Sequence, residues 1–229
     1  VIEASSYQLE YSKIFKSKYS VILNITPDHI ERHKNFKNYI KAKFRLLDSQ
    51  TTQSVAFIKR NDPVIIKKLR SKKYKQKIIK IDTFLQPPIF KKITNKYFMS
   101  SGNRENLIFV LKICQILKLN NEKILTTINK FKGLKYRQQI IFDSNYLTII
   151  NDSKSTSLAS SENLLKNIKN VYWILCCKKK KKDRFNLTKF QCKNFKGYIF
   201  GKYQIEFSKI LKNKLTIKKF KNIKDTLNQ

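Results

Sequence analysis

The sequence predicts an α/β protein in which parallel strands alternate with helices. Three observations support this fold class. Short apolar runs rich in β-branched residues alternate with segments whose apolar residues recur every three or four positions. This strand-then-helix order is typical of an open parallel sheet. Polar clusters also follow several of the strand-like runs, at the edge where open α/β sheets bind ligands.

The first half of the chain follows this alternation. Residues 20–25 form an apolar run that ends in the polar turn Thr26-Pro27-Asp28-His29, which indicates a buried strand. Residues 36–47 carry apolar side chains on one side at helical spacing. Pro63 begins a short helix over 63–69, because proline suits the first helical position. Further strands are expected at 54–58, 77–84 and 97–99.

The second half opens with the clearest helical pattern, at 103–119, and a second helix follows at 122–131. The segment 132–137 holds one of only four glycines and separates this helical pair from a hairpin joined at Ser144-Asn145. We therefore expect two domains, over 1–134 and 135–229. The later elements are expected as strands at 138–143, 146–150, 171–175 and 198–200 and as helices at 158–168, 205–211 and 224–229.

Composition limits the class of protein. Of the 229 residues 41% are hydrophobic, which is enough to build a core and argues against wholesale disorder. No stretch approaches the ~20 apolar residues of a membrane span. Val1 reads as the end of a strand and Gln229 lies in a starting helix. We therefore expect a fragment that is cut at both ends.

The charge of the chain is extreme. There are 50 Lys and Arg residues against 15 Asp and Glu residues, a formal net charge of +35. Clustered cations would indicate a nucleic-acid-binding module. The lysines are instead spread along the whole chain, as in a general drift of composition toward Lys, Asn and Ile. We therefore expect only weak, salt-sensitive, non-specific binding of polyanions.

The four cysteines give no sign of a metal site or a disulfide. They are Cys114, Cys176, Cys177 and Cys192, and none forms a C-x-x-C pair. We interpret them as small buried hydrophobic residues in a reducing compartment.

Two groups of polar residues are candidates for chemistry. The burst 151–156 follows an apolar run and precedes a helix, where Asp152, Lys154 and Thr156 can bind a charged ligand. An ordinary helix cap is the alternative for this segment. Glu3 and His29 both follow strand-like runs, and a carboxylate with an imidazole can bind a divalent ion. His33 lies in a charged stretch, and we expect it to be exposed.

Six segments resemble motifs of the Mur ligases, in the same order as in that family and from residue 1 to about residue 201. Residues 151–156 are similar to the segment of those members that add D-glutamate. The six are 3–10 (EASSYQLE, resembling E-L-S-S-F-Q-L-E), 22–33 (ILNITPDHIERH, resembling I-L-N-x-[ST]-x-D-H-[LM]-D-R-H), 39–43 (YIKAK, resembling Y-x-x-A-K), 103–106 (NREN, resembling H-N-x-x-N without its His), 133–137 (GLKYR, resembling G-L-x-H-R) and 151–156 (NDSKST, resembling N-D-S-K-[AG]-T).

The resemblance implies a fold and an activity. The fold would be a partial central ATPase-type α/β domain followed by a Rossmann-like ligand-binding domain. ATP would phosphorylate the carboxylate of UDP-N-acetylmuramoyl-L-alanine, and the amine of D-glutamate would attack the acyl phosphate to form an amide during peptidoglycan synthesis. Metal ions and cationic groups would offset the phosphate charge. A cytoplasmic monomer is implied.

The resemblance also implies roles for single residues, of which Lys43, His29 and Lys154 would take part in the reaction itself. A carbamylated Lys43 would become anionic beside Mg2+, which a plain lysine would repel. The implied contacts are Glu3, His29 and Lys43 for the metal, Ser5 and Gln8 for the UDP-muramoyl substrate, Asn106, Arg137 and Asp152 for ATP, and Lys154, Thr156 and Lys180 for D-glutamate.

The chain also departs from the family pattern. It has no G-x-x-x-x-G-K-[ST] phosphate loop, and Gly102 and Tyr136 stand where the family has histidines. The family's glycine-rich loop is replaced at 176–185 by a segment with five adjacent lysines. We therefore expect this chain to be inactive alone. The alternatives are a basic nucleic-acid-binding module and another ligase of the Mur or folylpolyglutamate synthetase type.

Overall fold

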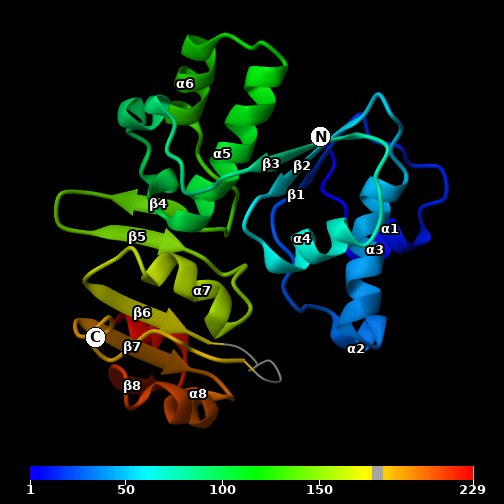
Figure 1. Ribbon diagram of the computed structural model, residues 1–229. Coiled ribbons are helices and arrows are strands. Elements are labelled where there is room, and N and C mark those ends of the chain that lie inside the picture. The colour runs from blue at the N-terminus through cyan, green and yellow to red at the C-terminus, as the bar shows by residue number, and fades with distance from the viewer. Residues whose placement is uncertain (177–182, 229) are drawn as a thin grey trace. The chain divides into compact units, whose positions relative to one another are not determined.

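The computed structural model describes residues 1–176 and 183–228, which form two compact units (Figure 1). Unit 1 comprises Val1–Phe90 and Glu105–Leu119, and unit 2 comprises Lys91–Arg104 and Asn120–Gln229. The expected α/β class with parallel strands is confirmed. The domain boundary expected at 134/135 falls inside unit 2 and stays a prediction about the family's domains.

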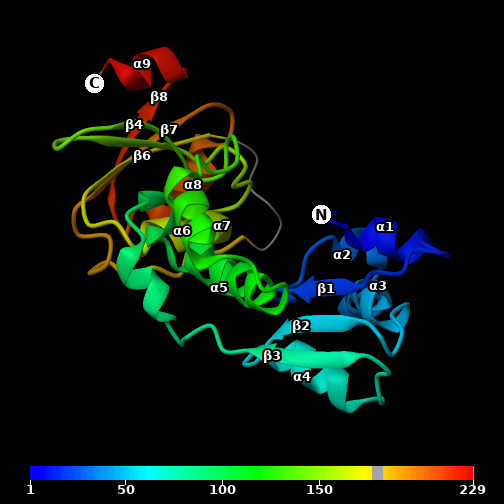
Figure 2. The same cartoon turned by 90° about the horizontal axis from the view of Figure 1, so that it is seen from above.

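Unit 1 is built on a three-stranded parallel sheet of order β1-β2-β3, whose strands lie side by side in Figures 1 and 2. In the central strand Ala56, Phe57 and Ile58, which point to alternate faces of the sheet, are all fully buried, which explains its continuous apolar sequence Val-Ala-Phe-Ile. The elements are α1 (Ser6–Tyr11), β1 (Tyr19–Ile22), α2 (Ile30–His33), α3 (Phe36–Asp48), β2 (Val55–Lys59), α4 (Pro63–Arg70) and β3 (Lys77–Ile81).

The core of unit 1 lies between the sheet and helices α3 and α4. Phe44 and Leu47 of α3, Ile58 of β2 and Ile65 of α4 are fully buried in one cluster. Asp62 fixes the start of α4, because its carboxylate accepts hydrogen bonds from the amides of Ile65 at 2.9 Å and Ile25 at 3.2 Å. This one side chain therefore ties the end of the first strand region to α4.

Unit 2 contains an antiparallel hairpin and a second parallel sheet of order β6-β7-β8. Its core gathers Ile199 of β7, Leu211 of α8 and the loop residue Leu187. Residues of α5 (Ser101–Ile116) are divided between the two units after Arg104. The other elements of the chain are the 3-10 helices η1 (Pro88–Lys92) and η2 (Lys96–Met99), and then α6 (Asn121–Lys130), β4 (Gln139–Asp143), β5 (Thr148–Asn151), α7 (Leu158–Leu165), β6 (Val171–Leu175), β7 (Phe195–Phe200), α8 (Gln204–Leu211), β8 (Thr216–Phe220) and α9 (Ile223–Leu227).

Some expected elements were wrong or missing. Residues 97–99 form part of the 3-10 helix η2 rather than a strand, because the Asn95 side chain caps it by accepting from the Tyr97 amide at 2.9 Å. Helices α1 and α2 were not predicted, because they are too short for apolar residues to recur at helical spacing. Strand β8 has lysines at its centre, which an edge strand tolerates because one side of it is unpaired.

The backbone φ angle is positive at several residues other than glycine. Among the described residues these are His29, Lys34, Lys118, Tyr136 and Gln138, and the glycines with a positive φ angle are Gly133 and Gly201. Within the described part of the chain, no helix has the length and apolar character to span a membrane.

Candidate functional site

Unit 1 carries the expected substrate contacts at the start of α1. Ser5 is the N-cap of this helix, and its hydroxyl accepts from the Gln8 amide at 3.2 Å. The Gln8 side chain in turn accepts from the Ser5 amide at 2.8 Å, which completes a capping box. Both side chains therefore have a structural role in holding the helix end, and the amide nitrogen of the Gln8 side chain and the hydroxyl proton of Ser5 remain as donors for a ligand.

His29 begins α2 from a strained position. Its φ angle is 52°, in the left-handed region, and its side chain is exposed. Asp28 holds the residue, since its carboxylate accepts from the His29 amide at 3.0 Å and lies 3.4 Å from Nε2. The Asp28 carboxylate thus provides a hydrogen-bond acceptor beside the imidazole of His29. Asp28 was not among the residues predicted from the sequence.

Lys43 lies half-buried on α3, with its Nζ 5.9 Å from the centre of the Tyr39 ring. Burial lowers the pKa of its ammonium group, whereas the charges of Asp28 and Glu3 act in the opposite direction. The structure therefore brings Glu3, Asp28 and Lys43 into one electrostatic environment, with His29 beside Asp28.

The carboxylates of Glu3 and Asp28 are of a chemical type that can bind Mg2+. Carboxylate oxygens are the protein ligands that Mg2+ prefers, and the ion usually keeps waters and substrate phosphates as its other ligands. Within the described residues, no group of three or more His, Cys, Asp or Glu side chains could enclose a metal ion. The metal-binding role of Glu3 and His29 therefore stays a prediction.

His33 is not exposed, contrary to the expectation from its charged neighbours. It is 3% exposed, and its Nε2 lies 3.0 Å from the Ser6 hydroxyl of α1. The expectation failed because the residues that cover it are far away in the sequence.

In unit 2 the burst 151–156 folds into a turn against residues 134–138. Asp152 accepts from the Gln138 amide at 3.0 Å and from the Ser155 hydroxyl at 2.6 Å. The Lys154 amide donates to the Tyr136 carbonyl at 3.0 Å. Burial raises the pKa of Tyr97. The charge of Arg137 lowers this pKa and the charge of Asp152 raises it, so both residues lie near the Tyr97 ring. The structure thus brings Arg137 and Asp152 together, as a nucleotide site would need.

The other expected ligand residues are placed less closely. Lys154 and Thr156 are exposed, and Ser157 rather than either of them caps α7, in a capping box with Ser160. The helix cap thus lies just after the burst, at Ser157, while the Asp152 carboxylate is held by Gln138 and Ser155. Asn106 is exposed on α5 in unit 1, and Lys180 lies outside the described residues.

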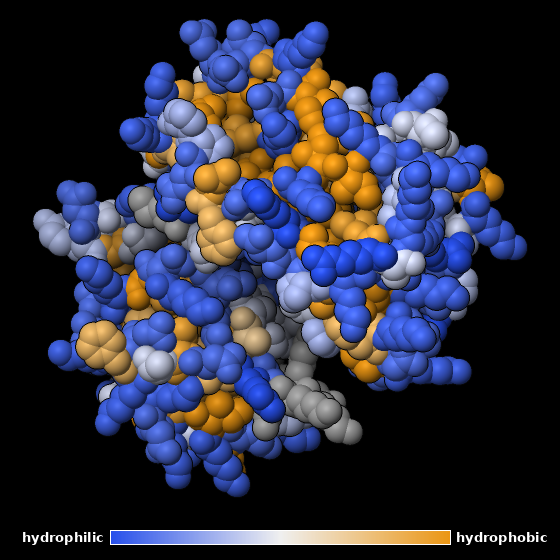
Figure 3. Space-filling model, viewed as in Figure 1, coloured by the Kyte–Doolittle hydropathy of each residue, from blue (hydrophilic) through white to orange (hydrophobic). Residues whose placement is uncertain are grey.

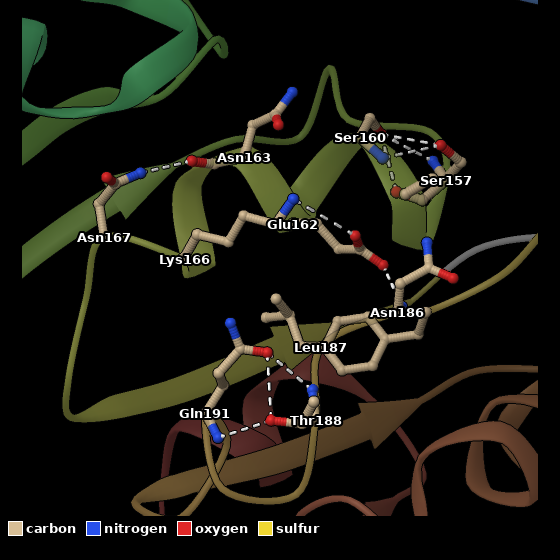
Figure 4. Close-up of polar contacts among 12 residues, drawn as sticks. Ser157, Ser160, Glu162, Asn163, Lys166, Asn167, Asn186, Leu187, Thr188 and Gln191 are labelled. Atoms are coloured by element: carbon tan, nitrogen blue, oxygen red, sulfur yellow. Dashed lines mark hydrogen bonds and ion pairs between the residues drawn. The ribbon is translucent and has the colours of Figure 1, made fainter.

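Two acidic residues attach the segment after residue 182 to α7. Asp183 accepts from the Leu158 amide at 2.8 Å and from the Ala159 amide at 3.3 Å, at the positive end of the helix. Glu162 is buried, accepts from the Asn186 amide and lies 3.9 Å from the Lys166 ammonium (Figure 4). The start of α7 and the residues following the lysine run are therefore held together.

Comparison with known proteins identifies similar sequences. The sequence profile of the Mur ligase middle domain matches residues 1–120. The UDP-N-acetylmuramoylalanine--D-glutamate ligase of Rickettsia bellii is 30% identical and aligns with 93% of this chain and 52% of the relative. The enzyme of the same name from Fusobacterium nucleatum is 32% identical, over 99% and 56%. The chain thus spans about half the length of the curated relatives that it matches.

Solved structures with the same fold are also found. A MurF ligase from Thermotoga maritima in complex with ADP superposes with a TM-score of 0.67 and 12% identity, over 98% of this chain and 58% of that one. MurF from Acinetobacter baumannii gives a TM-score of 0.65 and 14% identity, over 97% and 54%. At this identity the similarity shows the fold alone.

Proposed function

The chain belongs to the Mur ligase family, and from this premise we propose that it is part of an ATP-dependent ligase that joins D-glutamate to UDP-N-acetylmuramoyl-L-alanine. The observation that carries the proposal is the turn 151–156. Its sequence resembles the segment of the D-glutamate-adding members, and its Asp152 is hydrogen-bonded to the chain next to Arg137. Relatives that align with nearly all of this chain carry the name of the same activity.

The residues of unit 1 would serve the phosphorylation step. Ser5 and Gln8 would donate to the UDP-muramoyl substrate from the start of α1. Glu3 and His29, with a carbamylated Lys43, would hold Mg2+, which when bound offsets the charge on the transferring phosphate. Asp28 would orient His29 through the contacts described above.

The residues of unit 2 would bind the other two substrates. Arg137 would neutralise phosphate charge and Asp152 would accept from ribose hydroxyls. The resemblance to the family also assigns a nucleotide contact to Asn106. Lys154 and Thr156, together with Lys180, would bind the carboxylates of D-glutamate and direct its amine to the acyl phosphate. The amine nitrogen would form the new amide bond as phosphate leaves.

The whole protein would act as a monomer in the cytoplasm, where nucleotide-linked substrates are available. The proposal requires that it supply a phosphate-binding loop, since these 229 residues contain no G-x-x-x-x-G-K-[ST] motif.

The test is phosphate release by the whole protein with ATP, UDP-N-acetylmuramoyl-L-alanine and D-glutamate. We expect release to require D-glutamate, and to fall by at least ~100-fold in Lys43→Ala, because a positioned charge in a phosphoryl-transfer site contributes on that order. Lys41→Ala, an exposed lysine of the same helix, is the matched control and should stay near normal. Equal release with another amino acid or with a folate substrate would contradict the assignment of D-glutamate.

A further inference from the structure

His33 is a buried imidazole that bridges two consecutive turns of helix α1. Its side chain is fully buried, with Nε2 3.0 Å from the hydroxyl of Ser6 and Nδ1 3.7 Å from the carboxylate of Glu10. Its ring lies parallel to that of Tyr7, with the centroids 5.5 Å apart, and meets the Tyr39 ring edge-on at the same distance. One side chain of α2 therefore contacts α1 through two polar groups and one ring, and α3 through another ring.

The polar contacts define how the histidine is held. Nδ1 of His33 and Oε2 of Glu10 are both buried without a hydrogen-bond partner, and at 3.7 Å they face each other. We assign the proton to Nδ1, so that it points at the carboxylate while Nε2 accepts from the Ser6 hydroxyl. Closing this gap by less than 1 Å would satisfy both atoms.

The order carboxylate, imidazole, hydroxyl resembles that of a hydrolase triad, but the burial excludes that use. Ser6 is 2% exposed, so no substrate carbonyl could reach its hydroxyl. The cluster is suited instead to holding α1 in a fixed position.

Helix α1 and the histidine connect the residues that the proposed function uses. Ser6 follows Ser5 and lies in the same turn as Gln8, the two expected substrate contacts. At the other end of α2, the His33 amide donates to the carbonyl of His29 at 3.1 Å, and the Tyr7 ring lies 5.1 Å from the His29 ring. The cluster therefore spans the distance between the capping box and the expected metal ligand.

We propose that His33 is a positioning residue that locks α1 against the His29 segment through Ser6 and Glu10, and so fixes the UDP-muramoyl contacts relative to the metal site. The link to substrate rests on the proposed function, whereas the lock itself does not. His33 touches no reacting atom and acts through Ser5, Gln8 and His29.

The first test is amide hydrogen exchange on this chain. In His33→Phe the ring and most of the volume remain, but both nitrogens are lost. We expect the amides of Leu9 and Ser12, which close the turns of α1, to exchange at least ~10-fold faster, while those of α3 stay protected. His33→Gln, which can still accept from Ser6, should recover part of the protection. Unchanged exchange in α1 of His33→Phe, or equal loss in α1 and α3, would overturn the proposal.

The second test uses the whole ligase. His33→Phe should raise the KM for UDP-N-acetylmuramoyl-L-alanine by about tenfold and leave the KM for ATP within about twofold, because only one substrate is bound through α1. Ser6→Ala should act alike, and the double variant should be no worse than either single one. An inactive wild type would contradict the proposed function. The hydrogen-exchange result would then decide alone whether His33 holds α1 in place. An active wild type with both KM values unchanged in His33→Phe would overturn the positioning role.

Discussion

Lys43 is buried enough to change its chemistry. Burial lowers its pKa, while Asp28 and Glu3 oppose the shift. A lowered pKa increases the neutral fraction of the amine at a given pH, and only the neutral amine has the lone pair that reacts with CO2. The carbamate would carry a negative charge where the ammonium carried a positive one, which is the change that a nearby magnesium ion needs.

Lys43 should therefore form a carbamate. At fixed dissolved 13CO2, we expect a 13C NMR carbamate signal that grows as the pH rises through the pKa of Lys43. The signal should be lost in Lys43→Ala and kept in Lys41→Ala, whose lysine is exposed. A signal that survives in Lys43→Ala would show that another amine carries the group.

Gly133 occupies a position that other residues cannot adopt without strain. Its φ angle is 73°, and an added Cβ would lie 2.6 Å from Cε2 of Tyr97. Gly133→Ala should lower the free energy of unfolding by about 1–2 kcal/mol from the backbone alone, with the displaced ring adding to this. Gly102→Ala is the control, because nothing lies within 4 Å of its added Cβ and the site is helical. It should be neutral or stabilise by up to about 1 kcal/mol in urea unfolding.

His33 shows what residue-level reasoning could not predict. Its neighbours Glu31, Arg32 and Lys34 are exposed, so the local sequence reads as surface. The cover comes from Ser6, Tyr7 and Glu10, more than twenty positions away. Local composition carries no information about such a contact. The family motifs, by contrast, predicted Glu3, His29 and Lys43 as members of one site.

At the scale of elements, helix α4 depends on the buried cap Asp62. Asp62→Ala removes the cap and leaves the buried amide of Ile25 without its acceptor. The expected loss of unfolding free energy is about 2–4 kcal/mol, from ~1 for the cap and about 1–3 for the unsatisfied amide. Asn35→Ala, which removes the exposed cap of α3, should cost only about 1 kcal/mol. Equal losses in urea titrations would mean that the link to Ile25 contributes nothing.

Elements with their own signals were predictable. Asp62-Pro63 and the period of 36–47 marked α4 and α3, and both helices begin where expected. The hairpin was also correct, although its second strand begins two residues later than expected, at Thr148, because residues 144–147 form the turn. Strand β8 was missed because its lysines break the apolar pattern, and its existence depends on pairing with β7.

At the scale of the whole molecule, charge opposes folding. Figure 3 shows hydrophilic side chains over most of the visible face, and the net charge is +35. Salt screens this repulsion, since the Debye length falls from ~30 Å at 0.01 M to ~3 Å at 1 M. The free energy of unfolding should therefore rise with NaCl, measured by urea titration at a series of salt concentrations. A fall would mean that the attractive ion pairs outweigh the repulsion.

The same charge predicts how the chain meets polyanions. Binding to unrelated DNA duplexes should be equal in affinity and should weaken steeply with salt, because it reflects counterion release alone. A sequence preference in fluorescence anisotropy would support the nucleic-acid alternative.

Lys118 offers a direct way to stabilise the fold. Lys118 follows α5 and has a φ angle of 54°. Its amide donates to the Gln115 carbonyl at 3.1 Å, and the amide of Leu119 donates to the Cys114 carbonyl at 3.0 Å. This is the helix-ending motif that glycine favours. Lys118→Gly should raise the free energy of unfolding by about 1 kcal/mol, whereas Lys112→Gly within α5 should lower it by a similar amount.

The left-handed residues also connect the gene to the stability of its product. Glycine codons begin with GG, whereas those of Lys and Asn begin with AA, so a coding sequence drifting toward A and T loses glycine first. Among the described residues, two lysines, Lys34 and Lys118, have a positive φ angle, and at about 1 kcal/mol each they cost about 2 kcal/mol, a large share of the net stability of many domains. Codon usage can thereby affect the folding free energy, and changes from Lys to Gly at positions 34 and 118 are expected among variants selected for growth at higher temperature.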